Sequence, residues 1–145
     1  MAKINLDVPG KITDKGDYIE FYFPDKTQTA SEDSVQIGCV EYRRHHAPEL
    51  LAFHCPNEGQ IPVQYRVKMG RKGLLPGVSD EIIFQPVKGF TGVAIEIKRA
   101  TKSLSSKVSD SEREFLRKNR ERGGFSCVAY GVASYVQVLK YLDLI

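Results

Sequence analysis

The sequence predicts an α/β fold, in which helices pack on the faces of a mixed β-sheet. Short apolar stretches typical of strands are interleaved along the chain with longer stretches of helical periodicity. The chain has 145 residues, which is the length of one domain with one core, and it contains no internal repeat. Strands interleaved with helices at this length are typical of a sheet covered by helices.

Composition excludes several classes of protein. Hydrophobic residues make up 41% of the chain and charged residues 27%, which is typical of a globular domain rather than a disordered chain. There is no apolar run of membrane-spanning length, and residues 1–17 lack the apolar core of a signal peptide. The net charge of +3 permits a nucleic-acid partner without arguing for one. Cys39, Cys55 and Cys127 form no CxxC pair, so we expect free thiols in the core.

The first third of the chain predicts a hairpin followed by a helix. Residues 11–24 alternate around a turn at Lys15-Gly16, and we assign residues 1–30 to an N-terminal hairpin extension. This extension can either widen the sheet or build a dimer. A helix is expected from the N-cap Ser31, with an apolar stripe through Val35 and Cys39, and it ends before Pro48.

The middle and the end of the chain supply the remaining elements. We expect a strand at 50–55, a short helix from Pro62 to about Arg71, a turn at 74–77 and a hairpin within 77–100. Residues 99–108 are polar, basic and flexible in character. The following helix starts at Ser109 with a capping-box Glu112 and ends at Gly123-Gly124; a strand at 125–131 and an amphipathic helix at 132–142 complete the chain.

The hairpin within residues 77–100 carries charges on otherwise apolar strands. A three-residue loop, Val87-Lys88-Gly89, places Pro86 opposite Phe90. In that register Asp80 lies opposite Glu96, and Lys98 shares their face. A longer loop would separate the two acids.

Two carboxylates held close together in a poorly solvated place repel each other unless a cation joins them. Oxygen ligands of this kind suit Mg²⁺ or Mn²⁺, and such an ion can polarise a phosphate and activate water. The alternative is a structural salt bridge from Lys98 to Glu96 or Asp80 at an exposed sheet edge. The spacing alone favours neither interpretation.

The surrounding sequence resembles a known family. In order along the chain, the stretches SEDSVQIGCVEY, LLAFHCPNEG, GLLPGVSDEIIF, GVAIEIK and KVSDSEREFLRKNRERGGFSCVAYG resemble the VRR-NUC branch of the PD-(D/E)xK nuclease superfamily. The resemblance covers about residues 31–142. It implies a restriction-endonuclease-like mixed sheet flanked by helices, and we assign residues 31–145 to this nuclease-like domain.

The resemblance implies a set of site residues. The catalytic set is Asp80, Glu96, Lys98, Glu32 and Gln36, and the metal ligands are Asp80, Glu96, Glu32 and the main-chain carbonyl of Ile97. Glu32 can instead be a first-turn acid facing the helix dipole. Ser79 replaces the family's proline, and Glu112 replaces its helix glutamine; we interpret Glu112 as structural. His54 and Asn57 match the family loop, and we interpret His54 as a hydrogen-bonded core histidine and Asn57 as a turn former.

Basic residues on both sides of the hairpin are natural contacts for phosphate groups. They are Arg71, Lys72, Arg99, Lys102 and Lys107. The alternative is an ordinary solvated surface. We interpret the cations of residues 117–122 as a solvated helix face balanced by Glu114 and Glu121.

The sequence therefore predicts a metal-dependent DNA endonuclease. The resemblance implies Mg²⁺ or Mn²⁺, DNA as the substrate, and a homodimer that acts on branched DNA or four-way junctions. Because no signal peptide is recognised, we expect a cytoplasmic protein, and the small stand-alone architecture favours a bacterial or phage-infected host cell. The alternatives are a non-catalytic DNA-binding module and a structural α/β protein-interaction domain.

Overall fold

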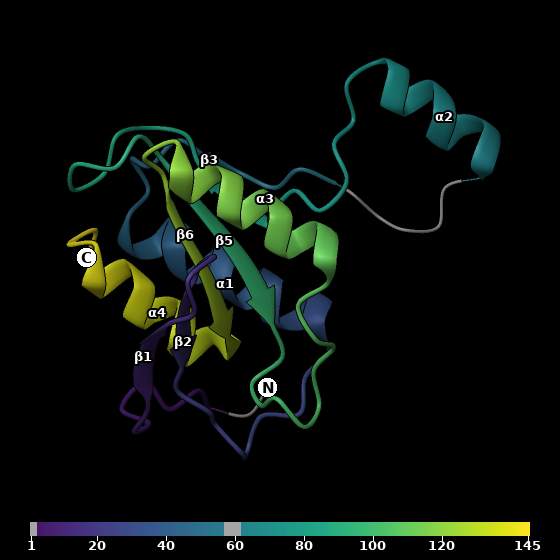
Figure 1. Ribbon diagram of the computed structural model, residues 1–145. Helices are drawn as coiled ribbons and strands as arrows, with labels where there is room; N and C mark the ends of the chain where they lie inside the picture. The colour runs from purple at the N-terminus through teal and green to yellow at the C-terminus, as the bar shows by residue number, and fades with distance from the viewer. Residues whose placement is uncertain (1–2, 57–61) are drawn as a thin grey trace.

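The computed structural model describes residues 3–56 and 62–145. Within these ranges the chain forms six strands and four helices (Figure 1). The strands are β1 (Lys11–Asp14), β2 (Ile19–Tyr22), β3 (Ala52–Phe53), β4 (Glu81–Ile83), β5 (Val93–Lys98) and β6 (Phe125–Tyr130). The helices are α1 (Glu32–His46), α2 (Val63–Arg71), α3 (Asp110–Glu121) and α4 (Gly131–Tyr141). No helix in the described part of the chain is long and apolar enough to cross a membrane.

The strands form one mixed sheet in the order β1-β2-β6-β5-β4-β3. The β2–β6 and β5–β6 pairs are parallel, and the other pairs are antiparallel. Helix α3 covers one face of the sheet, while α1 and α4 pack together on the other (Figure 1). The predicted α/β class, with a mixed sheet between helices, is confirmed.

The N-terminal hairpin widens the sheet. The turn predicted at Lys15-Gly16 is present, since the Lys15 N–H donates to the Tyr18 carbonyl and Gly16 has a φ of +88°. Strand β2 pairs with β6, which follows it by about a hundred residues. The division of the chain at residue 30 and a role of the hairpin in a dimer stay predictions.

The β4–β5 hairpin has the predicted strand register but a different turn. Glu81 lies opposite Ile95, so the next position toward the open end of the hairpin sets Asp80 opposite Glu96. The predicted three-residue loop is wrong, because Val87 rather than Pro86 lies opposite Phe90. Lys88 and Gly89 have φ values of +48° and +83°, which makes a two-residue turn whose twist matches the strands. The extra residue lies in the segment 84–86, where Pro86 has no N–H to donate to a ladder.

Both faces of the central strands are buried, as expected. Ile95 and Ile97 of β5 belong to the core shared with α1 and α4, whereas Ala94 packs with Leu116 of α3 and Val128 of β6. Every residue of β5 is buried. Polar side chains on this strand are therefore removed from water by α3.

Three features of the structure differ from the prediction: the length of one strand, the burial of one cysteine and the order of one loop. Of the stretch 50–55 only Ala52–Phe53 forms a strand. Cys39 and Cys127 are buried thiols, but Cys55 is half-buried beyond the end of β3 and is not a core thiol. Residues 99–108 are held by hydrogen bonds, including one from the Arg99 N–H to Ser105 Oγ, rather than being a free loop.

Helix α2 stands off the body of the molecule (Figure 1). It starts after Pro62, as predicted, and has no buried residue. It packs against no other helix or strand of the described chain. Its stability therefore does not come from burial of an apolar face.

Candidate metal centre

Three carboxylates from three different elements meet at one end of the sheet. Asp80 precedes β4, Glu96 lies in β5, and Glu32 is the first residue of α1. One oxygen from each carboxylate lies within 4.8 Å of the other two. They line a pocket of about 340 Å³ together with Gln36 of α1 and Glu112 of α3.

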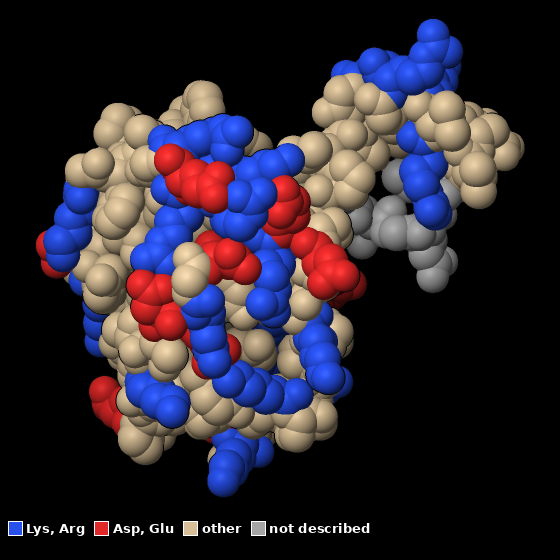
Figure 2. Space-filling view, in the orientation of Figure 1, with Lys and Arg blue, Asp and Glu red and all other residues tan. Residues whose placement is uncertain are grey.

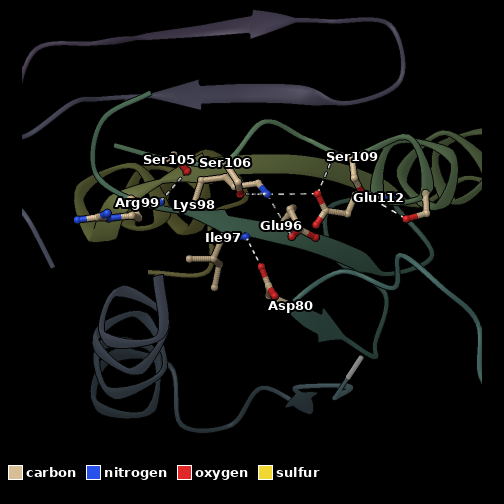
Figure 3. A network of polar contacts seen from close by, with 10 residues as sticks. Asp80, Glu96, Ile97, Lys98, Arg99, Ser105, Ser106, Ser109 and Glu112 are labelled. Carbon is tan, nitrogen blue, oxygen red and sulfur yellow. Dashed lines mark hydrogen bonds and ion pairs between the residues drawn. The ribbon is translucent and has the colours of Figure 1, made fainter. Parts of the chain in front are cut away.

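Local structure explains why these side chains converge. The register of β4 and β5 brings Asp80 beside Glu96, and Asp80 Oδ2 accepts a hydrogen bond of 2.7 Å from the Ile97 N–H (Figure 3). Gly77, with a φ of +79°, lets the preceding loop touch the start of α3, since a Cβ there would lie 2.2 Å from the Ser111 carbonyl oxygen. The segment from Gly77 to Asp80 is thus held by α3 at its start and by β5 at its end.

Ser79 occupies the position at which the family has a proline. It is fully buried, and its hydroxyl has no hydrogen-bond partner among the described residues. The substitution leaves Asp80 in contact with β5, so the acid is placed without a proline.

Burial makes the cluster electrostatically unfavourable without a cation. Glu96 is 2% exposed, and its Oε2 has no hydrogen-bond partner in the described part of the chain. Burial, with the Asp80 charge and Glu112 beside it, raises the pKa of Glu96 to about 11. Burial also raises the pKa of Asp80 and of Glu32. The orphaned oxygen and the all-oxygen donor set fit a hard divalent cation, so this cluster can hold one.

Lys98 supplies the positive charge nearest to the cluster. Its Nζ lies 3.2 Å from Glu112 Oε1, 3.3 Å from Ser106 Oγ and 3.9 Å from Glu96 Oε1 (Figure 3). Burial alone would lower the pKa of Lys98, but the carboxylates of Glu112 and Glu96 outweigh it and raise the pKa. Lys98 is therefore an ammonium that donates hydrogen bonds.

Glu112 has two roles. Its Oε1 accepts the Ser109 N–H at 2.8 Å, and its own N–H donates to Ser109 Oγ, so the predicted capping box is present. The same oxygen also contacts Lys98. The structural interpretation of Glu112 holds, but the cap also joins α3 to the candidate site.

Gln36 and His54 lie on the opposite side of the pocket. Gln36 Nε2 is 3.0 Å from His54 Nδ1, which is 2.7 Å from the Asp80 carbonyl oxygen. A carbonyl can only accept, so Nδ1 of His54 carries the proton. His54 is hydrogen-bonded as predicted, but it is exposed rather than in the core. Asn57 lies outside the described residues.

The five predicted phosphate contacts do not form one patch. Arg71 and Lys72 lie at the exposed end of α2. The Arg99 guanidinium donates to the carbonyls of Thr29, Ala30 and Leu104. Lys102 forms an ion pair of 2.8 Å with Glu20, and Lys107 is exposed. Arg99 thus holds the segment that precedes α1. All five phosphate contacts stay predictions.

The cations of residues 117–122 belong to a solvated face, as expected. Arg117 pairs with Glu114 and Glu121, whereas Arg120 reaches Asp14 of the N-terminal hairpin.

Sequence reasoning overlooked a buried polar network on the other face of the sheet. Glu81 accepts hydrogen bonds from Arg43 Nε at 3.0 Å and from the Tyr135 hydroxyl at 2.5 Å. All three residues are buried. The only sequence signal was an acid in an apolar strand beside Asp80. The network ties β4 to α1 and α4, the first of which carries Glu32 and Gln36.

Comparison with known proteins places the fold. No family model matches the chain, and no curated protein matches it significantly. A solved structure described as "VRR_NUC domain protein" matches 78% of this chain and 88% of its own, with a TM-score of 0.66 and 21% identity. The chain has the VRR-NUC fold. This confirms the resemblance at the level of the fold, and any chemistry of this VRR-NUC-like chain has to be argued from its own residues.

Proposed function

We propose that the protein is a metal-dependent endonuclease that hydrolyses phosphodiester bonds in DNA. The observation that carries the proposal is the cluster of the buried Glu96 with the half-buried Glu32 and Asp80 beside the Lys98 ammonium. This arrangement supplies both a place for a divalent cation and a fixed hydrogen-bond donor. The likeness to a protein with the same fold supports the assignment to nucleases.

Asp80, Glu96 and Glu32 would hold the ion, which we propose to be Mg²⁺ or Mn²⁺. Such an ion supplies a Lewis acid for a phosphoryl oxygen and lowers the pKa of bound water. The Ile97 N–H points toward Asp80, and in an extended strand the carbonyl of a residue points to the same side. The Ile97 carbonyl is therefore the natural fourth protein ligand.

Lys98 acts as a donor in this proposal. Glu112 and Ser106 hold its ammonium within reach of Glu96, so it needs little reorganisation during the reaction. A preorganised donor can orient the attacking water or stabilise negative charge that develops on the phosphoryl oxygens. Gln36 lines the same pocket and would contact the substrate or a water from the α1 side.

The test is a cleavage assay on labelled duplex, flap and four-way-junction DNA with Mg²⁺ or Mn²⁺. Wild type should cut, and Asp80→Asn, Glu96→Gln and Lys98→Met should each lose at least about a hundredfold in rate, as expected when a group acts directly on the reaction. Arg117→Gln on the outer face of α3 is the matched control and should cut like wild type. Equal cutting by all four variants would mean that the activity belongs to a contaminant.

We further propose that branched DNA, including four-way junctions, is the preferred substrate and that the protein acts as a homodimer. Resolving a junction needs two symmetric cuts, and the described residues of each chain offer one such cluster. A two-fold dimer supplies the second. Light scattering gives the mass in solution, and paired cuts in one junction reveal two coupled sites; a monomer that cuts all substrates equally would contradict this part.

A DNA-binding module without catalysis is the other outcome. In that case wild type binds DNA but neither cuts it nor binds Mn²⁺ in calorimetry.

A further inference from the structure

A second pocket lies beside the carboxylate cluster on the α3 face of the sheet. It has a volume of about 340 Å³. The N-terminal hairpin contributes Tyr18 and Glu20 to its wall, the segment before α3 contributes Ser106 and Lys107, and α3 contributes Arg113. The hairpin, whose role the sequence left open, is therefore one side of this pocket.

Lys98 separates this pocket from the carboxylate cluster. Ser106 lines the second pocket and lies 3.3 Å from Lys98 Nζ. On its other side Lys98 Nζ lies 3.2 Å from Glu112, which lines the first pocket. A ligand that extends past Lys98 would thus occupy both pockets.

The two pockets have opposite charge. The first is lined by five carboxylates: Glu32, Asp33, Asp80, Glu96 and Glu112. The second is lined by Lys102, Lys107 and Arg113 against the single carboxylate of Glu20, which already pairs with Lys102. Neither Lys107 nor Arg113 forms an ion pair with a described residue. Two positive charges in the second pocket are therefore unneutralised.

Neutral hydrogen-bond donors accompany these charges. Tyr18 and Tyr130 line the pocket, and burial raises the pKa of both phenols, so both stay protonated. The Arg113 guanidinium lies 5.9 Å from the centre of the Tyr18 ring, and Lys102 Nζ lies 5.6 Å from that of Tyr130. Each ring restrains one cation at the wall of the pocket.

We infer that this basic pocket binds a phosphate of the DNA strand next to the phosphate that reaches the carboxylate cluster. The inference rests on the proposed nuclease function. A nucleic-acid strand carries one negative charge per nucleotide, and neighbouring pockets of opposite charge suit two consecutive phosphates. One phosphate would contact a cation held by carboxylates, and the next would contact Lys107 and Arg113 directly. The N-terminal hairpin then belongs to the substrate site through Tyr18.

The test compares Arg113→Gln with Arg117→Gln, one turn apart on α3. Both arginines lie on the surface of the helix, but Arg117 is already paired with Glu114 and Glu121. The probe is a labelled DNA duplex that carries one neutral methylphosphonate at a chosen phosphate, with binding followed by fluorescence anisotropy. Loss of one charge-assisted contact should weaken binding by about tenfold.

The expected result is coupling at one position. Arg113→Gln and a methylphosphonate next to the cut site should each weaken binding about tenfold, and the combination should weaken it no further. Arg117→Gln should bind like wild type, and Tyr18→Phe, which removes only a hydroxyl, should weaken binding by about threefold. Equal binding by Arg113→Gln and Arg117→Gln would overturn the inference, as would losses that multiply at every methylphosphonate position.

The two proposals can fail separately. Mn²⁺ binding by Arg113→Gln should equal that of wild type, because the residue does not touch the carboxylate cluster. If wild type binds no Mn²⁺ and cuts no DNA, the nuclease proposal fails. The methylphosphonate scan needs no cleavage and therefore tests the basic pocket separately. The inference fails as well if this scan finds no phosphate position that is coupled to Arg113.

Discussion

At the residue scale, the molecule keeps the Glu96 carboxylate almost out of reach of water, with the half-buried Asp80 beside it. Glu96 is covered by α3, and Asp80 is held against β5 by the Ile97 N–H. A buried carboxylate oxygen without a hydrogen-bond partner destabilises a fold, and the proposed cation would supply the missing partner.

Glu96→Gln should stabilise the metal-free protein. The ordinary pKa of 4.5 rises to about 11 in the folded state, so the folded state holds its proton while the unfolded state loses it. The contribution of this carboxyl group to the free energy of unfolding is therefore fully present below pH 4.5. It falls as the pH rises toward 11. We expect the glutamine to raise the melting temperature by at least roughly 3 °C at pH 8 and by less at pH 5. Glu41→Gln, at an exposed carboxylate of α1, is the control and should change it at neither pH.

Asp80→Asn should remove Mn²⁺ binding without disturbing the hairpin. The asparagine carbonyl can still accept the Ile97 N–H, so only the charge is lost. Because changes behind a metal ligand already cost 10- to 100-fold in affinity, loss of a ligand should cost about a hundredfold or more. Calorimetry gives the affinity, and a melting temperature of the metal-free variant no lower than that of wild type establishes that the fold is intact. Unchanged Mn²⁺ affinity would place the ion elsewhere.

At the element scale, the position of α1 decides whether Glu32 reaches the other acids. The N-cap Ser31 starts the helix at the right residue, and the Arg43–Glu81–Tyr135 network holds its other end to β4 and α4. The hydrogen bonds of this network join buried groups. Removing one side chain of the network therefore leaves a buried polar group without its hydrogen-bond partner.

Arg43→Ala should destabilise the protein by about 3–5 kcal/mol, because it leaves the Glu81 carboxylate buried without its cation. Tyr135→Phe removes only a hydroxyl donor and should cost about 1–3 kcal/mol. Urea unfolding measures both. If Arg43→Ala costs no more than an exposed change such as Arg44→Ala, the network does not anchor α1.

At the scale of the whole molecule, α2 carries only positive charges, whereas the rest of the molecule carries charges of both signs. Figure 2 shows Lys and Arg side chains on α2 and no acidic ones, whereas acidic and basic side chains are interspersed on the visible face of the body. The four cations of this basic arm are Arg66, Lys68, Arg71 and Lys72. The two segments that join the arm to the body contribute Cys55 and Pro76 to the wall of the acidic pocket, so bound DNA would pass close to it.

Replacing these four cations with glutamine should weaken DNA binding without changing the melting temperature, because α2 buries no residue against the body. Each phosphate contact that is lost should reduce the slope of log affinity against log salt by about 0.9. Binding titrations at several salt concentrations measure this slope. A slope equal to that of wild type would exclude α2 from the DNA interface.

Much of the candidate site could be predicted because its causes are local in sequence. The predicted register of Asp80 and Glu96 is right although the loop that supported it is wrong. A two-residue turn at Lys88-Gly89 alone would set Asp80 opposite Ile97, and the extra residue in the segment 84–86 restores the predicted pairing. The capping box of Ser109 and Glu112 follows from a three-residue spacing. His54 could not be placed in the same way, because its partners Gln36 and Asp80 come from other elements.

The sequence by itself determined most of the elements and the helix start that holds Glu32. These depend on periodicity and caps, which act over a few residues. The face shared by Asp80, Glu96 and Lys98 follows from alternation along each strand, but the pairing of the two strands depends on the extra residue in the segment 84–86. Only the tertiary structure decided that β6 lies between β2 and β5, that Glu81 is buried with Arg43 and Tyr135, and that the N-terminal hairpin forms one wall of the basic pocket. Those contacts join segments far apart in the chain, and their free energy comes from packing that no local pattern encodes.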